Sequence, residues 1–318
     1  MISLTQLEYV LAVEKYRHFG KAAAACLVTQ PTLSQQIQKL EDELGLILFD
    51  RVQKPILLTP AGAGFLEQAK IVMREHQRLL HLAKKSTEEV SGDFHLGIIP
   101  TISGDLIPLF VDEFSRLYPK VDLFIEELKT ASILQELQED RLDAGILASP
   151  LRQEGMKVHP LYYESFVLYL SPGHPLTQKN EIEASDLDGA EMWMHSDGNC
   201  FRNQVINFCS LPVRGATSVL KNIHFESGSL DTLRQLIKKG SGYTLIPCLM
   251  TNRMGPQEKR DQVRTFEEPV PTREVSIAYR RDHWKLEIIA AIETVIAGVL
   301  PSELSRTQSN HFQILEVG

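Results

Sequence analysis

The segment Thr29-Gln30-Pro31-Thr32-Leu33-Ser34-Gln35-Gln36-Ile37 predicts a tight turn followed by a helix. Pro31 fits the first turn of that helix, where its missing N–H costs nothing. Apolar residues then recur at helical spacing, so the polar residues between them point the opposite way. The apolar stripe consists of Leu33, Ile37, Leu40 and Leu44. Gly45 is expected to end the helix, because glycine readily adopts the left-handed conformation at a helix terminus.

The elements on either side of this helix complete a small domain. Apolar residues at helical spacing predict one helix near Leu4–Leu11, and an alanine-rich run predicts a second over Phe19–Leu27. Phe49–Arg51 and Pro55–Leu58 are typical of the two strands of a hairpin, or wing. We therefore expect three short helices and a hairpin in residues 1–59.

Two interpretations of the polar face of the third helix are open. A helix that follows a tight turn can enter the major groove of DNA, where Gln35 would bind adenine through two hydrogen bonds. Alternatively, the face is only solvated and the domain is an ordinary three-helix fold. The charge distribution favours a polyanion at this end of the chain. Residues 1–90 hold 11 Lys and Arg against 10 Asp and Glu, whereas the remaining residues hold 22 against 31.

Five ordered blocks of this region closely resemble the winged helix-turn-helix of LysR-type transcriptional regulators. The blocks are Phe19–Ala23, Thr29–Ile37, Leu40–Gly45, Leu48–Arg51 and Leu58–Gly62. The resemblance implies double-stranded DNA as a partner and RNA polymerase as a further one. It also implies a set of residues at the groove, with one arginine that supports the contact of the wing. These residues are Gln30, Pro31, Thr32, Ser34, Gln35 and, in the wing, Arg51.

A long helix is expected next, from Ala61 to about Glu88, capped by Thr59-Pro60. Its apolar residues alternate by four and three, which is the pattern of a coiled-coil seam. The seam consists of Phe65, Ala69, Val72, His76, Leu79 and Ala83. We expect a dimerisation helix and hinge over residues 60–90; the alternative is a helix packed on its own domain. The family adds the expectation of a homotetramer assembled from such homodimers.

Composition limits the class of protein. A chain of 318 residues with 43% hydrophobic residues is long enough for two or three domains with buried cores. No apolar run approaches the ~20 residues of a membrane span, and the first residues do not form a signal peptide, so we expect a cytoplasmic protein without a membrane partner. Four cysteines without a C-x-x-C pair predict reduced thiols and no metal site.

Strands and helices alternate from Phe94 onward, which predicts a parallel sheet with crossover helices. Expected strands include Phe166–Ser171 and Glu191–Met194, and the strand Arg273–Tyr279 with the helix Lys285–Leu300 should return to the first lobe. We expect two lobes in residues 91–318, lobe I over about 91–163 plus 269–300 and lobe II over about 164–268. A ligand would bind in the cleft between them. We assign no role to the polar tail after Pro301.

The segment Ser196–Cys209 contains two of the four cysteines, nine residues apart. A short amphipathic helix is expected to begin near Cys200. Nine helical residues rise about 13 Å, whereas the Cα atoms of a disulfide lie within roughly 7 Å. The helix N-terminus and Arg202 should lower the pKa of the Cys200 thiol. These features indicate a redox switch; the alternative is two ordinary core residues.

The effector region resembles that of the LysR family, which is itself similar to periplasmic binding proteins. Several blocks resemble OxyR-type peroxide sensors of that family: Ile99–Thr101, Lys129-Thr130, the run Asp197-Gly198-x-Cys200-x-Arg202, Cys209 and Gly240–Gly242. The resemblance implies that Cys200 is the peroxidatic thiol and Cys209 the resolving one. It also implies a peroxide pocket, in which Thr101 and Thr130 supply hydroxyl groups. The other expected pocket residues are Pro100, Gly198, Asn199 and Arg202. Such sensors usually carry His and Asp where this chain has Asn199 and Asn203.

We expect an α+β protein with an all-α winged helix-turn-helix domain, a long dimerisation helix and a two-lobed α/β effector domain. The leading functional prediction is a DNA-binding activator of the oxidative stress response that senses hydrogen peroxide and needs no cofactor. A second possibility is a regulator of the same family that binds a small organic anion between the lobes, with both cysteines incidental. A cysteine-dependent enzyme ranks third, because no Cys/His catalytic arrangement is evident.

Overall fold

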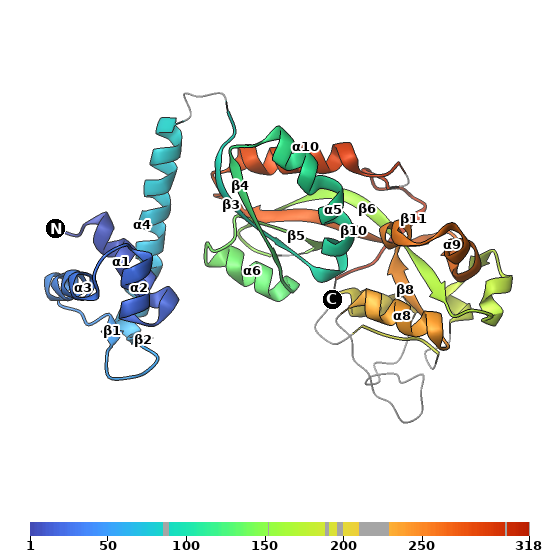
Figure 1. The fold of residues 1–318 in the computed structure, drawn as a ribbon, viewed down its shortest axis with the longest axis horizontal. Coiled ribbons are helices and arrows are strands. Elements are labelled where there is room, and N and C mark those ends of the chain that lie inside the picture. The colour runs from blue at the N-terminus through green and yellow to red at the C-terminus, as the bar shows by residue number, and fades with distance from the viewer. Residues whose placement is uncertain are drawn as a thin grey trace. The chain divides into compact units, whose positions relative to one another are not determined.

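The computed structural model describes residues 1–84, 89–151, 153–187, 191–195, 200–209, 229–302 and 304–317. The chain forms two compact units, Met1–Glu89 and Val90–Gly318 (Figure 1). Within the described residues, no helix is both long and apolar enough to cross a membrane.

The first unit contains the expected helices and wing. They are α1 (Leu4–Tyr16), α2 (Phe19–Ala25), α3 (Gln30–Leu44), the antiparallel strands β1 (Phe49–Asp50) and β2 (Leu57–Leu58), and α4 (Pro60–Lys84). The side chain of Thr29 caps α3 by accepting a hydrogen bond from the N–H of Thr32, and Gly45 ends α3 in the left-handed conformation. The apolar stripe of α3 faces the core as predicted. Three elements are shorter than expected: α2 ends at Ala25, and each of the two strands of the wing has two residues.

The seam of α4 divides into two parts. Ala69 is buried and Phe65 is half-buried, and Phe65 packs against the core of the first unit. Farther along, Val72 and Leu79 are 47% and 66% exposed. The first part of the seam therefore packs on its own domain, whereas the later part presents apolar surface to solvent. Dimerisation through α4 stays a prediction.

The second unit is built on a mixed sheet. Its strand order is β4 (Val121–Glu127), β3 (Gly92–Ile98), β5 (Ala144–Ser149), β10 (Val270–Arg280), β6 (Met156–Leu170), β9 (Val263–Phe266) and β7 (Glu181–Ile182). β3 is parallel to β4 and β5, but β10 is antiparallel to β5 and β6. β8 (Tyr243–Pro247) is also antiparallel to β6. The expected parallel arrangement is confirmed for β3, β4 and β5. The sheet as a whole is mixed, because the crossing strand β10 runs antiparallel to both β5 and β6.

Two hydrophobic cores confirm the two-lobed architecture of the effector unit. β6 and β10 connect the lobes as long, continuous strands. The lobe I core is closed by α5 (Pro100–Leu117), α6 (Thr130–Gln138) and α10 (Leu286–Val299), as Figure 1 shows. Lobe II carries α7 (Cys200–Cys209), α8 (Leu230–Lys239), the 3-10 helix η3 (Cys248–Arg253) and α9 (Pro256–Gln262). The predicted return of the chain to the first lobe through β10 and α10 is confirmed.

Two further expectations need correction. The predicted strand Glu191–Met194 is reduced to an isolated bridge between Met192 and Tyr243. The polar tail has a structural role, because β11 (Phe312–Ile314) pairs in parallel with β10 and Leu315 is buried in the lobe II core. Its polar composition concealed a three-residue strand that is too short to give a clear alternating pattern.

Candidate functional site

The polar face of α3 is solvent-accessible where the sequence predicted DNA contacts. Gln30, Pro31, Thr32 and Gln35 are exposed, and Ser34 is half-buried. A shallow hollow of about 700 Å³ brings together Pro31, Ser34, Gln35 and Arg51. Gln30 and Thr32 lie in the first turn of the same helix, outside the lining of this hollow. One helix thus presents five of the six predicted residues.

Arg51 also has a partner that sequence reasoning missed. Its guanidinium lies 2.6 Å from the carboxylate of Glu41, which is buried. The same carboxylate accepts hydrogen bonds from the N–H groups of Leu48 and Phe49, at 2.8 and 3.3 Å. Glu41 therefore holds the start of the wing against α3, and Arg51 balances its charge. Glu41 is the first of three consecutive acidic residues, so no pattern in the sequence distinguished it.

The predicted redox helix is present as α7, which begins at Cys200 and ends at Cys209. The helical rise places the two Cα atoms about 13 Å apart, too far for a disulfide while α7 stays helical. Burial raises the pKa of the Cys209 thiol to about 12, so this thiol is protonated at neutral pH. The side chain of Cys200 lies outside the described part of the structure, as do Gly198 and Asn199.

Arg202 is buried and donates a hydrogen bond from Nη1 to the carbonyl oxygen of His195, 3.1 Å away. His195 itself is 2% exposed. Burial, together with the positive charge of Lys129, lowers the pKa of His195 to about 4. The imidazole is therefore neutral at physiological pH. Sequence reasoning missed His195, which precedes the cysteine segment and showed no distinctive spacing.

Thr101 and Thr130 lie at the same edge of the lobe I sheet. Thr101 is in the first turn of α5, which follows β3, and Thr130 begins α6, which follows β4. β3 and β4 are neighbouring parallel strands, so their carboxyl ends and the helices that follow are adjacent. Pro100 is the first residue of α5 and fixes where the helix starts. This edge is the expected location of a ligand site in a sheet of this kind.

Arg273 connects Thr101 to the crossing strands and was also missed. Its guanidinium is 2% exposed and donates to Thr101 twice, to Oγ1 at 3.2 Å and to the carbonyl oxygen at 2.9 Å. It also lies 2.6 Å from the carboxylate of the fully buried Glu164 on β6. Glu164 accepts a further hydrogen bond from the N–H of Leu249. β6 also carries Lys157, and β10 also carries Glu274 and Arg280, so only the fold shows that Glu164 pairs with Arg273.

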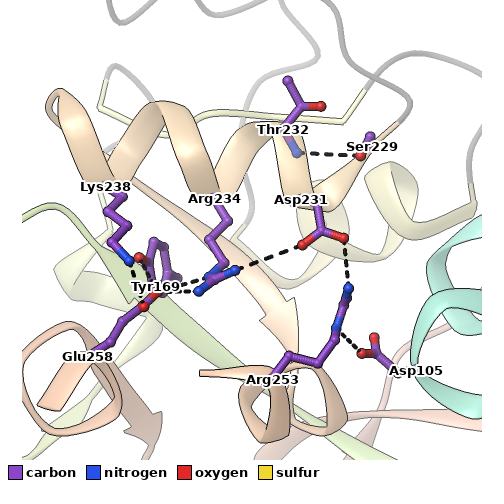
Figure 2. A network of polar contacts seen from close by, with 9 residues as sticks. All are labelled: Asp105, Tyr169, Ser229, Asp231, Thr232, Arg234, Lys238, Arg253 and Glu258. Carbon is purple, nitrogen blue, oxygen red and sulfur yellow. Dashed lines mark hydrogen bonds and ion pairs between the residues drawn. The ribbon is translucent and has the colours of Figure 1, made fainter. Parts of the chain in front are cut away.

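A second ionic group links the lobes close to this edge, as Figure 2 shows. Arg253 of η3 lies 2.6 Å from Asp105 of α5 and 2.8 Å from Asp231 of α8. Burial raises the pKa of Asp105, although the positive charge of Arg253 opposes this effect. The helix that carries Thr101 is thus connected through one arginine to lobe II. Across the described ranges, no group of three or more His, Cys, Asp and Glu side chains could hold a metal ion.

Comparison with known proteins places both units in families. Residues 4–63 match the bacterial regulatory helix-turn-helix proteins of the lysR family, and residues 87–311 match the LysR substrate binding domain. A hydrogen peroxide-inducible genes activator of Haemophilus influenzae is 35% identical over 279 residues, which are 88% of this chain and 91% of the relative. The DNA-binding transcriptional dual regulator OxyR of Escherichia coli is 37% identical over 281 residues, 88% of this chain and 90% of the relative.

Solved structures of OxyR proteins are also similar to this chain. A full-length OxyR variant of Pseudomonas aeruginosa is 32% identical and superposes with a TM-score of 0.77, covering 94% of this chain and 99% of that one. A hydrogen peroxide-bound OxyR variant of Corynebacterium glutamicum is 26% identical, with a TM-score of 0.61 over 93% of this chain and 92% of that one. These relatives are regulators of transcription rather than enzymes.

Proposed function

Because this chain belongs to the LysR family of transcriptional regulators and to its OxyR-type members, we propose that hydrogen peroxide switches it through Cys200 and Cys209. The observation that carries the proposal is α7, a helix with one cysteine at each end, in a chain whose relatives are peroxide-inducible activators. The helical rise keeps the Cα atoms of the two cysteines about 13 Å apart as long as α7 stays helical.

The first step of the proposed reaction consumes peroxide. The Cys200 thiolate attacks one oxygen of hydrogen peroxide, so an S–O bond forms, the O–O bond breaks and hydroxide leaves to take up a proton as water. Cys200 becomes a sulfenic acid. The N-terminus of α7 favours the thiolate. The Thr101 hydroxyl, held by Arg273, and the Thr130 hydroxyl are donors for the peroxide oxygens, and Pro100 positions the turn that carries Thr101.

The second step forms the disulfide. The sulfur of Cys209 attacks the sulfur of the sulfenic acid, an S–S bond forms, the S–O bond breaks and a second water leaves. Two thiols are oxidised and one peroxide is reduced to two waters. Cys209 must first leave the lobe II core, because its thiol is held there with a pKa raised to about 12. The reaction therefore requires α7 to unwind, and this rearrangement is the proposed signal.

We propose that the oxidised protein changes the transcription of its target genes in the cytoplasm. We propose that α3 enters the major groove of double-stranded DNA and that Gln30, Pro31, Thr32, Ser34 and Gln35 contact it, with Arg51 at the wing. The exposed apolar residues Val72 and Leu79 of α4 support a homodimer, and effector units would join two dimers into a tetramer. RNA polymerase is the proposed partner of the oxidised activator.

The test follows the oxidation of single thiols. Stopped-flow mixing of the reduced protein with hydrogen peroxide, followed by mass analysis, should yield a Cys200–Cys209 disulfide. Cys209→Ser should stop the reaction at a sulfenic acid on Cys200, whereas the control Cys248→Ser should still form the disulfide. Arg202→Ala should slow the first step at least about tenfold, equivalent to about 1.4 kcal/mol, because the buried guanidinium holds the segment that precedes Cys200. Asn199→His should leave the rate equal or higher.

One outcome contradicts the peroxide mechanism. If Cys200 reacts no faster than a thiol in an unfolded peptide, peroxide is not the signal. A regulator of the same family that binds a small organic anion between the lobes would then take its place.

A further inference from the structure

The effector unit contains a cavity of about 620 Å³ that the proposed peroxide chemistry does not use. Ser165 and Val167 of β6 line it. Phe166, the residue between them, points to the other side of the strand, where its ring lies 5.3 Å from that of Phe201 on α7. Since successive side chains of a strand face opposite sides, the cavity lies across β6 from the redox helix.

The polar wall of this cavity is positively charged. Lys259 and Arg260 of α9 and Arg264 of β9 line it, and no Asp or Glu is among the described residues that do so. The acidic neighbour of Lys259 is Glu258, whose carboxylate is turned away. It lies 2.6 Å from Arg234 and 2.8 Å from Lys238, as Figure 2 shows. Arg260 is largely exposed and lies 3.9 Å from the carboxylate of Asp261, whereas Lys259 and Arg264 have no carboxylate partner in the described part of the chain. The cavity therefore keeps an excess of positive charge.

The cations differ in how firmly they are held. Arg264 is half-buried and donates to the carbonyl oxygens of Thr177 and Lys179, at 2.5 and 2.7 Å. These bonds fix the guanidinium but do not neutralise it. Lys259 is half-buried, and its ammonium donates to the amide oxygen of Asn252 at 3.3 Å. A partly desolvated cation gains from an anion, because their attraction is stronger here than in bulk water.

Other residues that line the cavity are apolar. They include Val167, Leu249 and Leu304, and Cys248 lines it as well. Burial raises the pKa of the Cys248 thiol to about 12, so the sulfur adds neutral surface rather than negative charge. A ligand that fits both kinds of residue needs one anionic end and one apolar body. The volume is within the range of small-molecule sites.

We propose that this cavity binds a small organic carboxylate, with the carboxylate at Lys259 and Arg260 and the apolar body against Val167 and Leu249. Neither Thr101 nor Thr130 lines the site, which lies across β6 from the redox helix. Its occupant would contact β6, one of the two strands that connect the lobes.

Fluorine NMR on the full-length reduced protein tests the proposal with 4-fluorobenzoate as the probe. Its resonance should broaden saturably on addition of protein. Neutral 4-fluorobenzamide, which has nearly the same shape, should not compete with it. Lys259→Ala and Arg260→Ala should each weaken binding about two- to fivefold, the upper part of the range for exposed charge pairs. Lys239→Ala is the control, because this exposed lysine of α8 does not line the cavity.

Three results would contradict the proposed carboxylate site. The first is the absence of saturable binding of 4-fluorobenzoate. The second is equal binding of the benzamide, which would mean that charge is not recognised. The third is binding that survives Lys259→Ala but is lost in Thr130→Val, which would locate the probe in the cleft between the lobes. Because none of these outcomes involves Cys200, the proposed peroxide response is tested independently.

Discussion

The face of α3 and the site around Thr101 differ in how they are made. On α3, one helix supplies the exposed polar side chains of Gln30, Thr32 and Gln35, which lie open to a partner. Around Thr101, the groups that matter are buried and bonded to one another, and they come from α5, β6 and β10. The polar groups of the exposed face can form hydrogen bonds with a ligand. Those of the buried site bond to one another and so fix the geometry of the site.

This difference predicts where substitutions have their effect. Changes at the buried site should lower stability, because a group that loses its partner there stays desolvated. Changes on α3 should lower DNA affinity and leave stability almost unchanged. Both tryptophans of the chain, Trp193 and Trp284, lie in the effector unit, so their fluorescence reports the unfolding of that unit.

The largest effect is expected for Glu164→Gln. This change leaves the guanidinium of Arg273 buried without its counter-charge, which should cost about 3–5 kcal/mol in the free energy of unfolding. Urea unfolding followed by tryptophan fluorescence measures it. Glu113→Gln is the matched control, because its ion pair with Arg116 is on the surface and should be nearly silent.

A double variant sharpens the same prediction. Glu164→Gln combined with Arg273→Gln removes both charges, so it should be more stable than the sum of the single losses implies. Additive losses would mean that the two side chains are not coupled and that the buried site is not organised by this ion pair.

The next effect concerns pH. His195 has a folded-state pKa of about 4 and an ordinary pKa of 6.5 when unfolded. Above pH 6.5 both states are neutral at this residue and its full contribution to stability is present. As the pH falls toward 4, the unfolded state binds a proton that the folded state does not, so stability declines by up to about 3 kcal/mol.

His195→Gln should remove this part of the pH dependence in urea titrations of the effector unit. Some slope should persist, because burial also lowers the pKa of His283 to about 4. Only the wild type loses the contribution of His195 as the pH falls toward 4. The free energies of unfolding of the two proteins should therefore become more similar at low pH. Identical slopes in both proteins would contradict a buried neutral His195.

The smallest effect is expected on α3. Gln35→Ala should weaken operator binding by about 1–3 kcal/mol and relax the preference at one base pair in each half-site, with unchanged unfolding of either unit. Fluorescence anisotropy on a set of single-base operator variants measures both quantities. Gln68→Ala, an exposed position of α4, is the control. An unchanged base preference would remove Gln35 from the groove.

The same contrast explains what could be predicted from the sequence. The apolar stripe of α3 and the cap at Gly45 follow from local spacing, so both were predicted correctly. α7 was also predicted, because its apolar residues and flanking cysteines are contiguous. The ion pair of Arg273 with Glu164 was not, since 109 residues separate its members and only the antiparallel pairing of β6 with β10 brings them together. Long-range register cannot be read from the periodicity of either strand.

The short strand β11 has a practical consequence for anyone who labels this chain. The carbonyl oxygen of Leu315 accepts a hydrogen bond from Nε2 of Gln204, which lies in the middle of α7, and the N–H of Leu315 donates to Thr272. Unwinding of α7 would withdraw the Gln204 donor and loosen this attachment. A fluorophore attached at the C-terminus, or the amide exchange rate of Leu315, would then report the conformation of α7 without touching either cysteine. For the same reason, a reporter protein fused there without a spacer would disturb the helix that it is meant to observe.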